Sequence, residues 1–225
     1  ALAEHAVYFM LQDCYHTKEL LLAQSKKQFG VEGSNQWKGL YGRTAGIIGM
    51  GNNGKMVADR LYAMGMKVIY DYYPIQGYDY LTEKLCVQNG DSLDTLLAAS
   101  DYIILTVSLT DATYHMLNKE TFAKVKKGAF LVNIARGGLI DTAALIDALN
   151  DGTLSGAGLD VFEEQPLNPQ SPLWKMENVY ITPHSTPQVP DRAARSIEII
   201  RANADAPMTA TLRLSTYDFG TKEAK

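Results

Sequence analysis

Residues 44–71, TAGIIGMGNNGKMVADRLYAMGMKVIYD, decide the fold. They place Gly49, Gly51 and Gly54 in a GxGxxG pattern between a short apolar run and an amphipathic segment, residues 55–64. In a loop between a strand and a helix, the first glycine permits a tight turn, the second lets the backbone approach a pyrophosphate, and the third lets helix and strand pack closely. The N-terminal N–H groups and positive dipole end of the helix then face the anion. The stretch therefore predicts a strand, a phosphate-binding loop and a helix.

A carboxylate closes the same stretch. Asp71 follows Gly49 by about 20 residues, the separation expected for an acid that binds the ribose hydroxyls of a dinucleotide. Such a carboxylate accepts hydrogen bonds from the 2′- and 3′-hydroxyls and repels a 2′-phosphate, so NAD is the expected cofactor rather than NADP. The alternative is a glycine-rich turn and a surface acid that coincide by chance. The order of strand, loop, helix, strand and acid argues against that alternative.

Apolar runs alternate with amphipathic segments along the chain, which is typical of a doubly wound parallel sheet. Six runs have the length and composition of buried strands, namely residues 45–48, 67–70, 102–107, 129–134, 158–161 and 179–182. Helices are expected at residues 55–64, at residues 93–99 after the N-cap Ser92, and at residues 142–149 after Asp141, with Gly152 as a stop signal. The predicted fold class is α/β, with a Rossmann-type doubly wound parallel sheet.

Both ends of the chain have helical patterns. Apolar positions recur at spacings of four and three residues near the start, and at four, three and four near the end. These positions are Val7, Leu11 and Cys14 in the first segment and Ala193, Ile197, Ile200 and Ala204 in the last. Because the chain opens on Ala1 directly in a helical pattern, we expect either that an upstream segment has been removed or that the sequence was cut there on purpose.

The composition excludes several classes of function. Hydrophobic residues make up 46% and charged residues 20% of the chain, and the net charge is −4 without a long basic block, so nucleic acid is not an expected partner. No apolar run approaches the roughly 20 residues that a membrane span needs, and no secretory leader pattern opens the chain, so a cytoplasmic protein is expected. Cys14 and Cys86 lack metal-ligand spacing, and we predict no metal site and no disulfide framework.

Four segments carry a resemblance to a known family. The run from Gly42 to Pro74, the arginine motif LVNIARGG at residues 131–138, the acidic motif GAGLDVFEEQP at residues 156–166 and the TPH motif at residues 182–184 resemble the D-2-hydroxyacid dehydrogenases. Residues 3–5, Ala-Glu-His, resemble the helix between the two domains of these enzymes. The family includes D-lactate, phosphoglycerate, glyoxylate and hydroxypyruvate enzymes.

The resemblance also implies a domain arrangement. Residues 1–30 are expected to form the interdomain helix, residues 31–185 the NAD-binding Rossmann domain, and residues 186–225 a return helix and a tail toward the substrate domain. In the family the flavodoxin-like substrate domain comes from roughly the first hundred residues and the C-terminal tail. We therefore expect that part of this domain is missing here, including the loop that helps to hold a substrate carboxylate.

The resemblance implies three catalytic residues. Arg136 matches the arginine that binds the substrate, and a guanidinium suits this role because its planar fork fits a carboxylate and its charge does not titrate away. His184 matches the proton donor and acceptor, since free imidazole titrates near neutrality. The acid that usually pairs with this histidine stands five residues after Asp160, where this chain has Gln165. A neutral amide orients the ring but does not favour imidazolium by charge, and the neighbouring Glu164 is the alternative partner.

Further residues are implied to contact the cofactor. Ile134 and Ala135 match the backbone beside the nicotinamide ribose, and Asp160 matches a position near the nicotinamide carboxamide. With the glycines and Asp71, the implied cofactor set is Gly49, Gly51, Asn52, Asn53, Gly54, Asp71, Val107, Ser108, Thr113, Ile134, Ala135, Arg136, Asp160 and His184. His5, His16 and His115 lie outside the TPH motif, and structural roles are expected for them.

Three local departures separate the chain from the family pattern. Asn53 stands where the family has an aliphatic residue, and the strand that leads to Asp71 is one residue shorter. One residue in a strand reverses the face on which side chains lie, so the shortening bears on the direction of Asp71. After His184, the residues Ser185, Thr186 and Pro187 depart from the family's turn of small residues.

Two functions from different classes follow. The first is an NAD-dependent oxidoreductase that interconverts a D-2-hydroxy acid and its 2-keto acid by hydride transfer. The second is an NAD(H)-sensing dimerisation module without turnover, similar to the corepressors that share this domain. The expected partners are the small-molecule acid and a second copy of the chain in a homodimer. Arg136 and His184 favour the enzyme, whereas Gln165 and the absent substrate domain favour the sensor.

Overall fold

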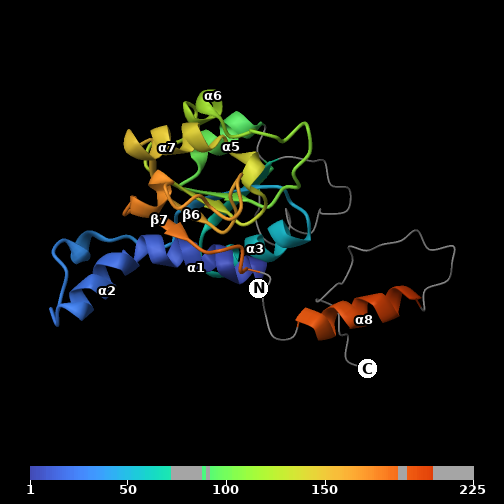
Figure 1. Cartoon of the computed structure of the whole chain (residues 1–225), viewed down its shortest axis with the longest axis horizontal. Helices are drawn as coiled ribbons and strands as arrows, with labels where there is room; N and C mark the ends of the chain where they lie inside the picture. Colours follow the sequence, from blue (N-terminus) through green and yellow to red (C-terminus); the bar gives the residue numbers. More distant parts are fainter. Residues whose placement is uncertain (72–87, 90–91, 187–191, 205–225) are drawn as a thin grey trace. The chain divides into compact units, whose positions relative to one another are not determined.

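The computed structural model describes residues 1–71, 88–89, 92–186 and 192–204. Contacts divide the chain into two units, Leu2–Thr186 and Ala1 with Pro187–Lys225. The larger unit is a parallel sheet with helices on both faces (Figure 1). The domain boundaries expected at residues 30 and 185 remain predictions.

The sheet of the larger unit has the strand order β3-β2-β1-β4-β5-β6-β7, and each neighbouring pair is parallel. Its strands are β1 (Thr44–Ile48), β2 (Lys67–Asp71), β3 (Gln88–Asn89), β4 (Tyr102–Leu105), β5 (Ala129–Asn133), β6 (Leu154–Leu159) and β7 (Val179–Ile181). The order reverses at β1, which lies between β2 and β4. Sheets of this kind bind ligands at the carboxyl ends of the strands beside such a reversal. The doubly wound parallel sheet predicted from the sequence is confirmed.

Helices cover the two faces of this sheet. They are α1 (Leu2–Cys14), α3 (Asn52–Ala63), α5 (Leu93–Ala99), α6 (Lys119–Phe122) and α7 (Thr142–Asn150). The helix α2 (Thr17–Ser25) contacts α1 and extends away from the sheet in Figure 1. The 3-10 turns are η1 (Ser34–Gln36), η2 (Gly137–Leu139) and η3 (Pro172–Lys175). In Figure 1, α1 and α3 lie on one face and α5, α6 and α7 on the other. The predicted N-caps are confirmed, because Ser92 Oγ accepts from the Thr95 N–H, and the Asp141 carboxylate accepts from the N–H groups of the second and third residues of α7.

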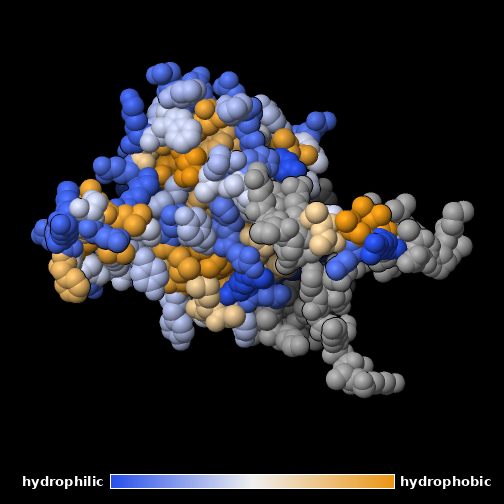
Figure 2. Space-filling view, turned by 60° about the horizontal axis from the view of Figure 1, so that its bottom comes forward, coloured by the Kyte–Doolittle hydropathy of each residue, from blue (hydrophilic) through white to orange (hydrophobic). Residues whose placement is uncertain are grey.

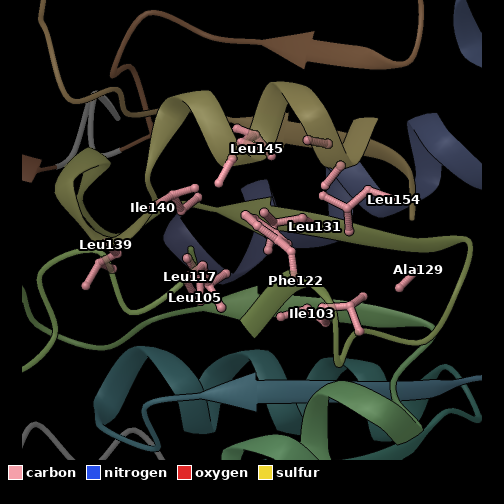
Figure 3. Packing of buried hydrophobic residues seen from close by; sticks show 14 of the residues in the cluster. Ile103, Leu105, Leu117, Phe122, Ala129, Leu131, Leu139, Ile140, Leu145 and Leu154 are labelled. Atoms are coloured by element: carbon pink, nitrogen blue, oxygen red, sulfur yellow. The ribbon is translucent and has the colours of Figure 1, made fainter. Parts of the chain in front are cut away.

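Side chains of the strands alternate between two hydrophobic cores. In β4, Tyr102 and Ile104 belong to the core under α1 and α3, whereas Ile103 and Leu105 belong to the core under α5, α6 and α7. Figure 3 shows the second core, where these strand residues lie beneath Leu145 of α7. Each fully buried aliphatic side chain stabilises the fold by about 1.5–3 kcal/mol. The two cores therefore hold the carboxyl edge of the sheet as a rigid platform.

A partly buried polar cluster anchors α1 to the sheet. The Tyr102 hydroxyl donates to Asp13 Oδ2 at 2.8 Å and accepts from Arg43 Nη1 at 2.9 Å. Burial raises the pKa of Asp13, and the Tyr102 hydrogen bond and the Arg43 charge oppose this only in part. The first helix is thus fixed to β4 by a polar contact as well as by apolar packing.

Several elements differ from the sequence predictions, and one of them is α6, which no predicted segment covers. β3 has two residues, too few to show a periodicity. β6 begins at Leu154 rather than at residue 158. Its residues 155–158 are small, and a Cβ on Gly156 would lie 2.4 Å from the Asn178 carbonyl oxygen. The opening segment contains two helices, since His16 has a left-handed backbone (φ 45°) that ends α1 and precedes α2.

The smaller unit contains α8 (Arg192–Ala204), which confirms the last predicted helix, and Ile197 and Ile200 are exposed on it.

Hydrophilic side chains cover much of the face of the molecule in Figure 2. Among the described residues, no helix has the length and apolarity to cross a bilayer.

Candidate active site

The carboxyl edge of the sheet gathers the predicted site residues. The phosphate loop follows β1, Asp71 ends β2, and the loop with Val107 and Ser108 follows β4. The arginine turn follows β5, and the TPH turn follows β7. Because all of these strands are parallel, the ends that carry these residues share one edge.

The glycine loop has the backbone that each glycine predicts. Gly49 has a φ of 100°, and a Cβ there would lie 2.5 Å from the Val107 nitrogen. A Cβ on Gly54 would lie 2.2 Å from the Gly49 carbonyl oxygen, so α3 packs directly on the loop. The Thr106 hydroxyl donates to the Gly49 oxygen at 2.5 Å and fixes the turn from the end of β4. Glycine is thus required at both positions by close contacts.

Gly51 faces open space instead. It is the N-cap of α3 with a φ of −76°, and a Cβ on it would meet no heavy atom within 4 Å. The N-cap residue, a glycine, has no side chain that could accept a hydrogen bond from the first turn of α3. A loop that is tight at Gly49 and Gly54 but open in front of Gly51 fits the approach of a pyrophosphate to the backbone. Asn52 and Asn53, implied as cofactor contacts, form the first turn of α3.

The end of β2 lies beside this loop. Asp71 pairs with Ile48, the residue before Gly49, in the parallel register of β1 and β2. This register places the backbone of Asp71 at the same edge as the glycine turn. The side chain of Asp71 lies outside the described residues, so its predicted contact with the ribose remains a prediction.

The loop after β4 is folded around Thr113. The Thr113 hydroxyl accepts from the Thr110 N–H at 2.7 Å and donates to the Ser108 carbonyl oxygen at 2.9 Å. Thr113 is buried, Val107 is buried and Ser108 is exposed. Of the three implied cofactor residues here, Thr113 therefore shapes the loop from inside, whereas Ser108 is open to a ligand.

The turn that carries Arg136 is built by a buried asparagine. Asn133 Nδ2 donates to the Arg136 carbonyl oxygen at 2.9 Å, and its Oδ1 accepts from the Ala135 N–H at 3.0 Å. These bonds hold Ile134, Ala135 and Arg136 in a fixed turn at the end of β5. The Arg136 side chain is exposed, and its Nη1 donates to the Ala135 carbonyl oxygen at 2.6 Å. The remaining guanidinium N–H groups suit a carboxylate.

His184 and Gln165 are brought together from different loops. His184 Nδ1 lies 2.8 Å from Gln165 Oε1, and Gln165 Nε2 donates to the Phe162 carbonyl oxygen at 3.3 Å. The amide oxygen only accepts, so Nδ1 of His184 carries the hydrogen, and Nε2 is left for a reacting group. A neutral ring in this tautomer accepts a proton at Nε2, and a protonated ring donates one there.

The neighbouring acids have other contacts. Glu163 accepts from His115 Nε2 at 2.5 Å and from the N–H and hydroxyl of Thr142. Burial tends to raise the pKa of Glu163, but the hydrogen bonds from Thr142 and His115 outweigh it and lower the pKa. Between the described residues, no hydrogen bond joins Glu164 to His184. Glu163 thus fixes the acidic loop to α7, and the geometry favours Gln165 over Glu164 as the partner of His184.

Asp160 lies beneath the turn that carries His184. Its side chain is 1% exposed, and it accepts hydrogen bonds from Thr182, Ser185 and Thr186. The backbone N–H of His184 donates to the Asp160 carbonyl oxygen at 2.9 Å. Ser185 and Thr186, which depart from the family pattern, therefore bind this carboxylate together with Thr182.

Several residues of this site were missed by sequence reasoning. Thr106 fixes the glycine turn, Asn133 builds the arginine turn, and Thr182 binds Asp160. Each lies directly at the end of a strand, which is the signal that could have drawn attention to it. In the described part of the chain, no group of three or more His, Cys, Asp or Glu residues is placed to hold a metal ion.

Comparison with known proteins agrees with this geometry. Residues 7–186 match the family model of the D-isomer specific 2-hydroxyacid dehydrogenase, NAD binding domain. The chain is 42% identical over 164 residues to a glyoxylate reductase from Korarchaeum cryptofilum, covering 73% of this chain and 48% of that protein. It is 38% identical over 198 residues to a D-3-phosphoglycerate dehydrogenase from Mycobacterium bovis, covering 81% of this chain and 36% of that protein. The chain thus spans about half or less of the length of these relatives.

Solved structures show the same likeness. The structure resembles D-lactate dehydrogenase from Aquifex aeolicus, solved with NAD and lactic acid, with a TM-score of 0.79 at 31% identity. The match covers 89% of this chain and 65% of that one. With the family match over residues 7–186, these findings establish that the chain belongs to the D-isomer specific 2-hydroxyacid dehydrogenases and carries their NAD-binding domain.

Proposed function

We propose that the protein interconverts a D-2-hydroxy acid and its 2-keto acid, with NAD as the redox partner. One observation carries the proposal: a histidine held through Nδ1 by Gln165 lies at the sheet edge that also bears Arg136 and the phosphate loop. Reduction of a keto acid needs a hydride donor, a cation for the carboxylate and an acid for the new alkoxide. Arg136 and His184 supply the last two.

The roles of the residues follow from their atoms. The open loop at Gly51 and the N-terminus of α3 would hold the cofactor pyrophosphate, and Asp71 would bind the ribose. Bound NADH supplies the hydride that reaches the carbonyl carbon. Arg136 binds the substrate carboxylate through its planar N–H groups. Protonated His184 gives its Nε2 proton to the carbonyl oxygen as that oxygen becomes an alkoxide, and in oxidation the neutral ring takes the hydroxyl proton back.

An assay of the full-length protein tests this function. NADH oxidation is measured with a panel of glyoxylate, pyruvate and hydroxypyruvate, for the wild type and for His184→Gln. The wild type should turn over at least one of these acids, and His184→Gln should lose about 10²–10⁴-fold in kcat while it still binds NADH. Absence of turnover with every acid, together with NADH-dependent dimerisation, would instead favour the sensing module.

The expected homodimer is a proposal that one surface supports. Three successive leucines of α2, Leu20, Leu21 and Leu22, are 41–58% exposed. In Figure 2 the end of the molecule formed by α2 carries hydrophobic surface among hydrophilic groups. Light scattering should give the mass of a dimer for the wild type and of a monomer for Leu21→Glu, with Lys26→Glu as the matched control. Equal masses for wild type and Leu21→Glu would remove α2 from the interface.

Two further expectations concern the class of substrate and the cellular location. A small hydroxy or keto acid as substrate agrees with the names of the relatives, which include glyoxylate reductase and D-3-phosphoglycerate dehydrogenase. The cytoplasmic location inferred from the sequence remains a prediction.

A further inference from the structure

A buried carboxylate organises the turn that carries His184. Both oxygens of Asp160 are in use: Oδ1 accepts from the Thr182 hydroxyl at 2.6 Å and from the Ser185 N–H at 2.9 Å, and Oδ2 accepts from the N–H and hydroxyl of Thr186. Among the described residues, no lysine or arginine forms an ion pair with this carboxylate. A buried charge without a cation is stabilised by its hydrogen bonds, so loss of one of them raises the free energy of the folded state.

One of these donors is fixed from the other end of the chain. His5 of α1 lies with Nε2 3.0 Å from Thr182 Oγ1. The His5 ring packs edge-on against Phe9 at 4.7 Å between centroids, which sets its orientation. A contact thus runs from α1 through Thr182 to Asp160, joining residues 177 positions apart.

The available hydrogens determine which atom is the donor in the contact between His5 and Thr182. The Thr182 hydroxyl has one hydrogen, and Asp160 is an acceptor only, so that hydrogen goes to Asp160. Thr182 Oγ1 therefore accepts from His5, and His5 must carry its hydrogen on Nε2. Burial lowers the pKa of His5, and the negative charge of Asp160 opposes this only in part, so a neutral ring is the form that makes the contact near neutrality.

We propose that His5 and Thr182 are positioning residues for His184. The Nε2–H of His5 holds the Thr182 hydroxyl so that its hydrogen points at Asp160, and Asp160 holds the Ser185 and Thr186 donors on the other side of His184. The turn on which His184 has a left-handed backbone (φ 51°) is thereby fixed at both flanks. This inference rests on the proposed role of His184 in proton transfer, and it revises the structural reading of His5.

Substitutions at Thr182 separate positioning from general stability. Thr182→Val keeps the shape but removes the hydroxyl, whereas Thr182→Ser keeps the hydroxyl. Thr121→Val is the matched control, because its hydroxyl also joins backbone groups, at the capping box of α6. In the full-length protein we expect Thr182→Val to lose about tenfold or more in kcat for reduction, the equivalent of a hydrogen bond to a charged group. NADH affinity should hold, and Thr182→Ser should restore kcat.

Two results would overturn the positioning role. One is a kcat for Thr182→Val that equals the wild type. The other is a loss of kcat in Thr121→Val as large as in Thr182→Val, since the effect would then be one of stability. His5 gives a second pair that does not depend on Thr182: His5→Gln keeps an N–H donor, and His5→Leu removes it. Only His5→Leu should lose kcat, and equal losses in the two variants would contradict the contact.

A spectroscopic test does not require turnover. Long-range proton–nitrogen NMR correlations report the tautomer of each of the four histidines, and His5→Gln and His184→Gln identify the two relevant signals. We expect His5 in the Nε2–H form and His184 in the Nδ1–H form, with the His184 signals altered in Thr182→Val and kept in Thr182→Ser. A His5 ring protonated on Nδ1, or His184 signals unchanged in Thr182→Val, would overturn the proposal. A protein that lacks turnover but shows the expected signals would refute the proposed function alone.

Discussion

His184 Nδ1 lies 2.8 Å from Gln165 Oε1, so the ring that would move the proton is oriented by a neutral amide. The amide nitrogen donates to the Phe162 carbonyl oxygen, which fixes the oxygen toward the ring. A carboxylate in this place would favour imidazolium by its charge, whereas an amide supplies orientation without charge. The pH dependence of catalysis is therefore expected to differ from that of relatives with an acid here.

Gln165→Glu in the full-length protein tests this difference. Keto acid reduction needs a protonated ring, and a nearby negative charge favours that form. We expect the alkaline limb of the pH profile for reduction to move upward by about one pH unit, the size that an opposite charge commonly produces. Steady-state kcat/KM from acid to alkaline pH is the measurement. Glu164→Gln is the matched control and should leave the profile in place. An unchanged profile in Gln165→Glu with a collapsed one in Glu164→Gln would assign the role to Glu164.

The glycine loop predicts a substitution that weakens NADH binding without a change in the stability of the fold. Because a Cβ on Gly51 meets no atom and its φ suits any residue, Gly51→Ala should fold as the wild type does and bind NADH at least tenfold more weakly. Gly54→Ala should be destabilised, since its Cβ would lie 2.2 Å from the Gly49 oxygen. Fluorescence titration with NADH and urea unfolding measure the two effects. Unchanged NADH affinity in Gly51→Ala would place the pyrophosphate elsewhere.

Cofactor preference tests Asp71. A carboxylate at the ribose repels a 2′-phosphate, so we expect NADH to bind at least tenfold more tightly than NADPH, about 1.4 kcal/mol. Asp71→Ser should reduce the ratio of the two affinities, because it weakens the binding of NADH and allows NADPH to bind. Titration of both cofactors against wild type and variant decides the matter. Equal affinities in the wild type would mean that Asp71 does not face the ribose, as the short strand before it would allow.

The pH dependence of stability tests the partly buried polar cluster that anchors α1. Burial raises the pKa of Asp13, so the folded state binds a proton more tightly than the unfolded state. The contribution of Asp13 is therefore most favourable below its unfolded pKa of about 3.9 and is lost as the pH rises through the raised folded pKa. Asp13→Asn lacks this loss, so the stability of the variant relative to wild type should increase from pH 4 to pH 7. Urea unfolding at both pH values measures it. A pH-independent difference would contradict the raised pKa.

Local pattern was sufficient for the framework of the fold. The alternation of apolar runs located six strands, and the GxGxxG pattern located a loop in which close contacts require glycine at Gly49 and Gly54. β3 was missed because two residues carry no periodicity, and the early start of β6 was hidden by small residues, since glycine and alanine favour no single element.

The candidate site could be predicted only in part. Arg136, His184 and the partner at residue 165 came from resemblance, because nothing in their local spacing shows which loops meet. The His5–Thr182–Asp160 contact could not be predicted, since it joins the first helix to the turn after β7 and depends on a hydroxyl proton that has no sequence signature. Such contacts are set by the packing of the whole sheet.

The central claim is that a hydride passes between the cofactor and C2 of a D-configured acid, and isotope transfer tests it most directly. NADH carrying deuterium at the transferred position of C4 is supplied to the full-length protein with a 2-keto acid. Chiral chromatography then gives the configuration of the product, and mass spectrometry gives its deuterium content. The account predicts a D-2-hydroxy acid with one deuterium on C2, formed by the wild type and almost absent with His184→Gln. A product of L configuration, or a product without deuterium, would contradict it.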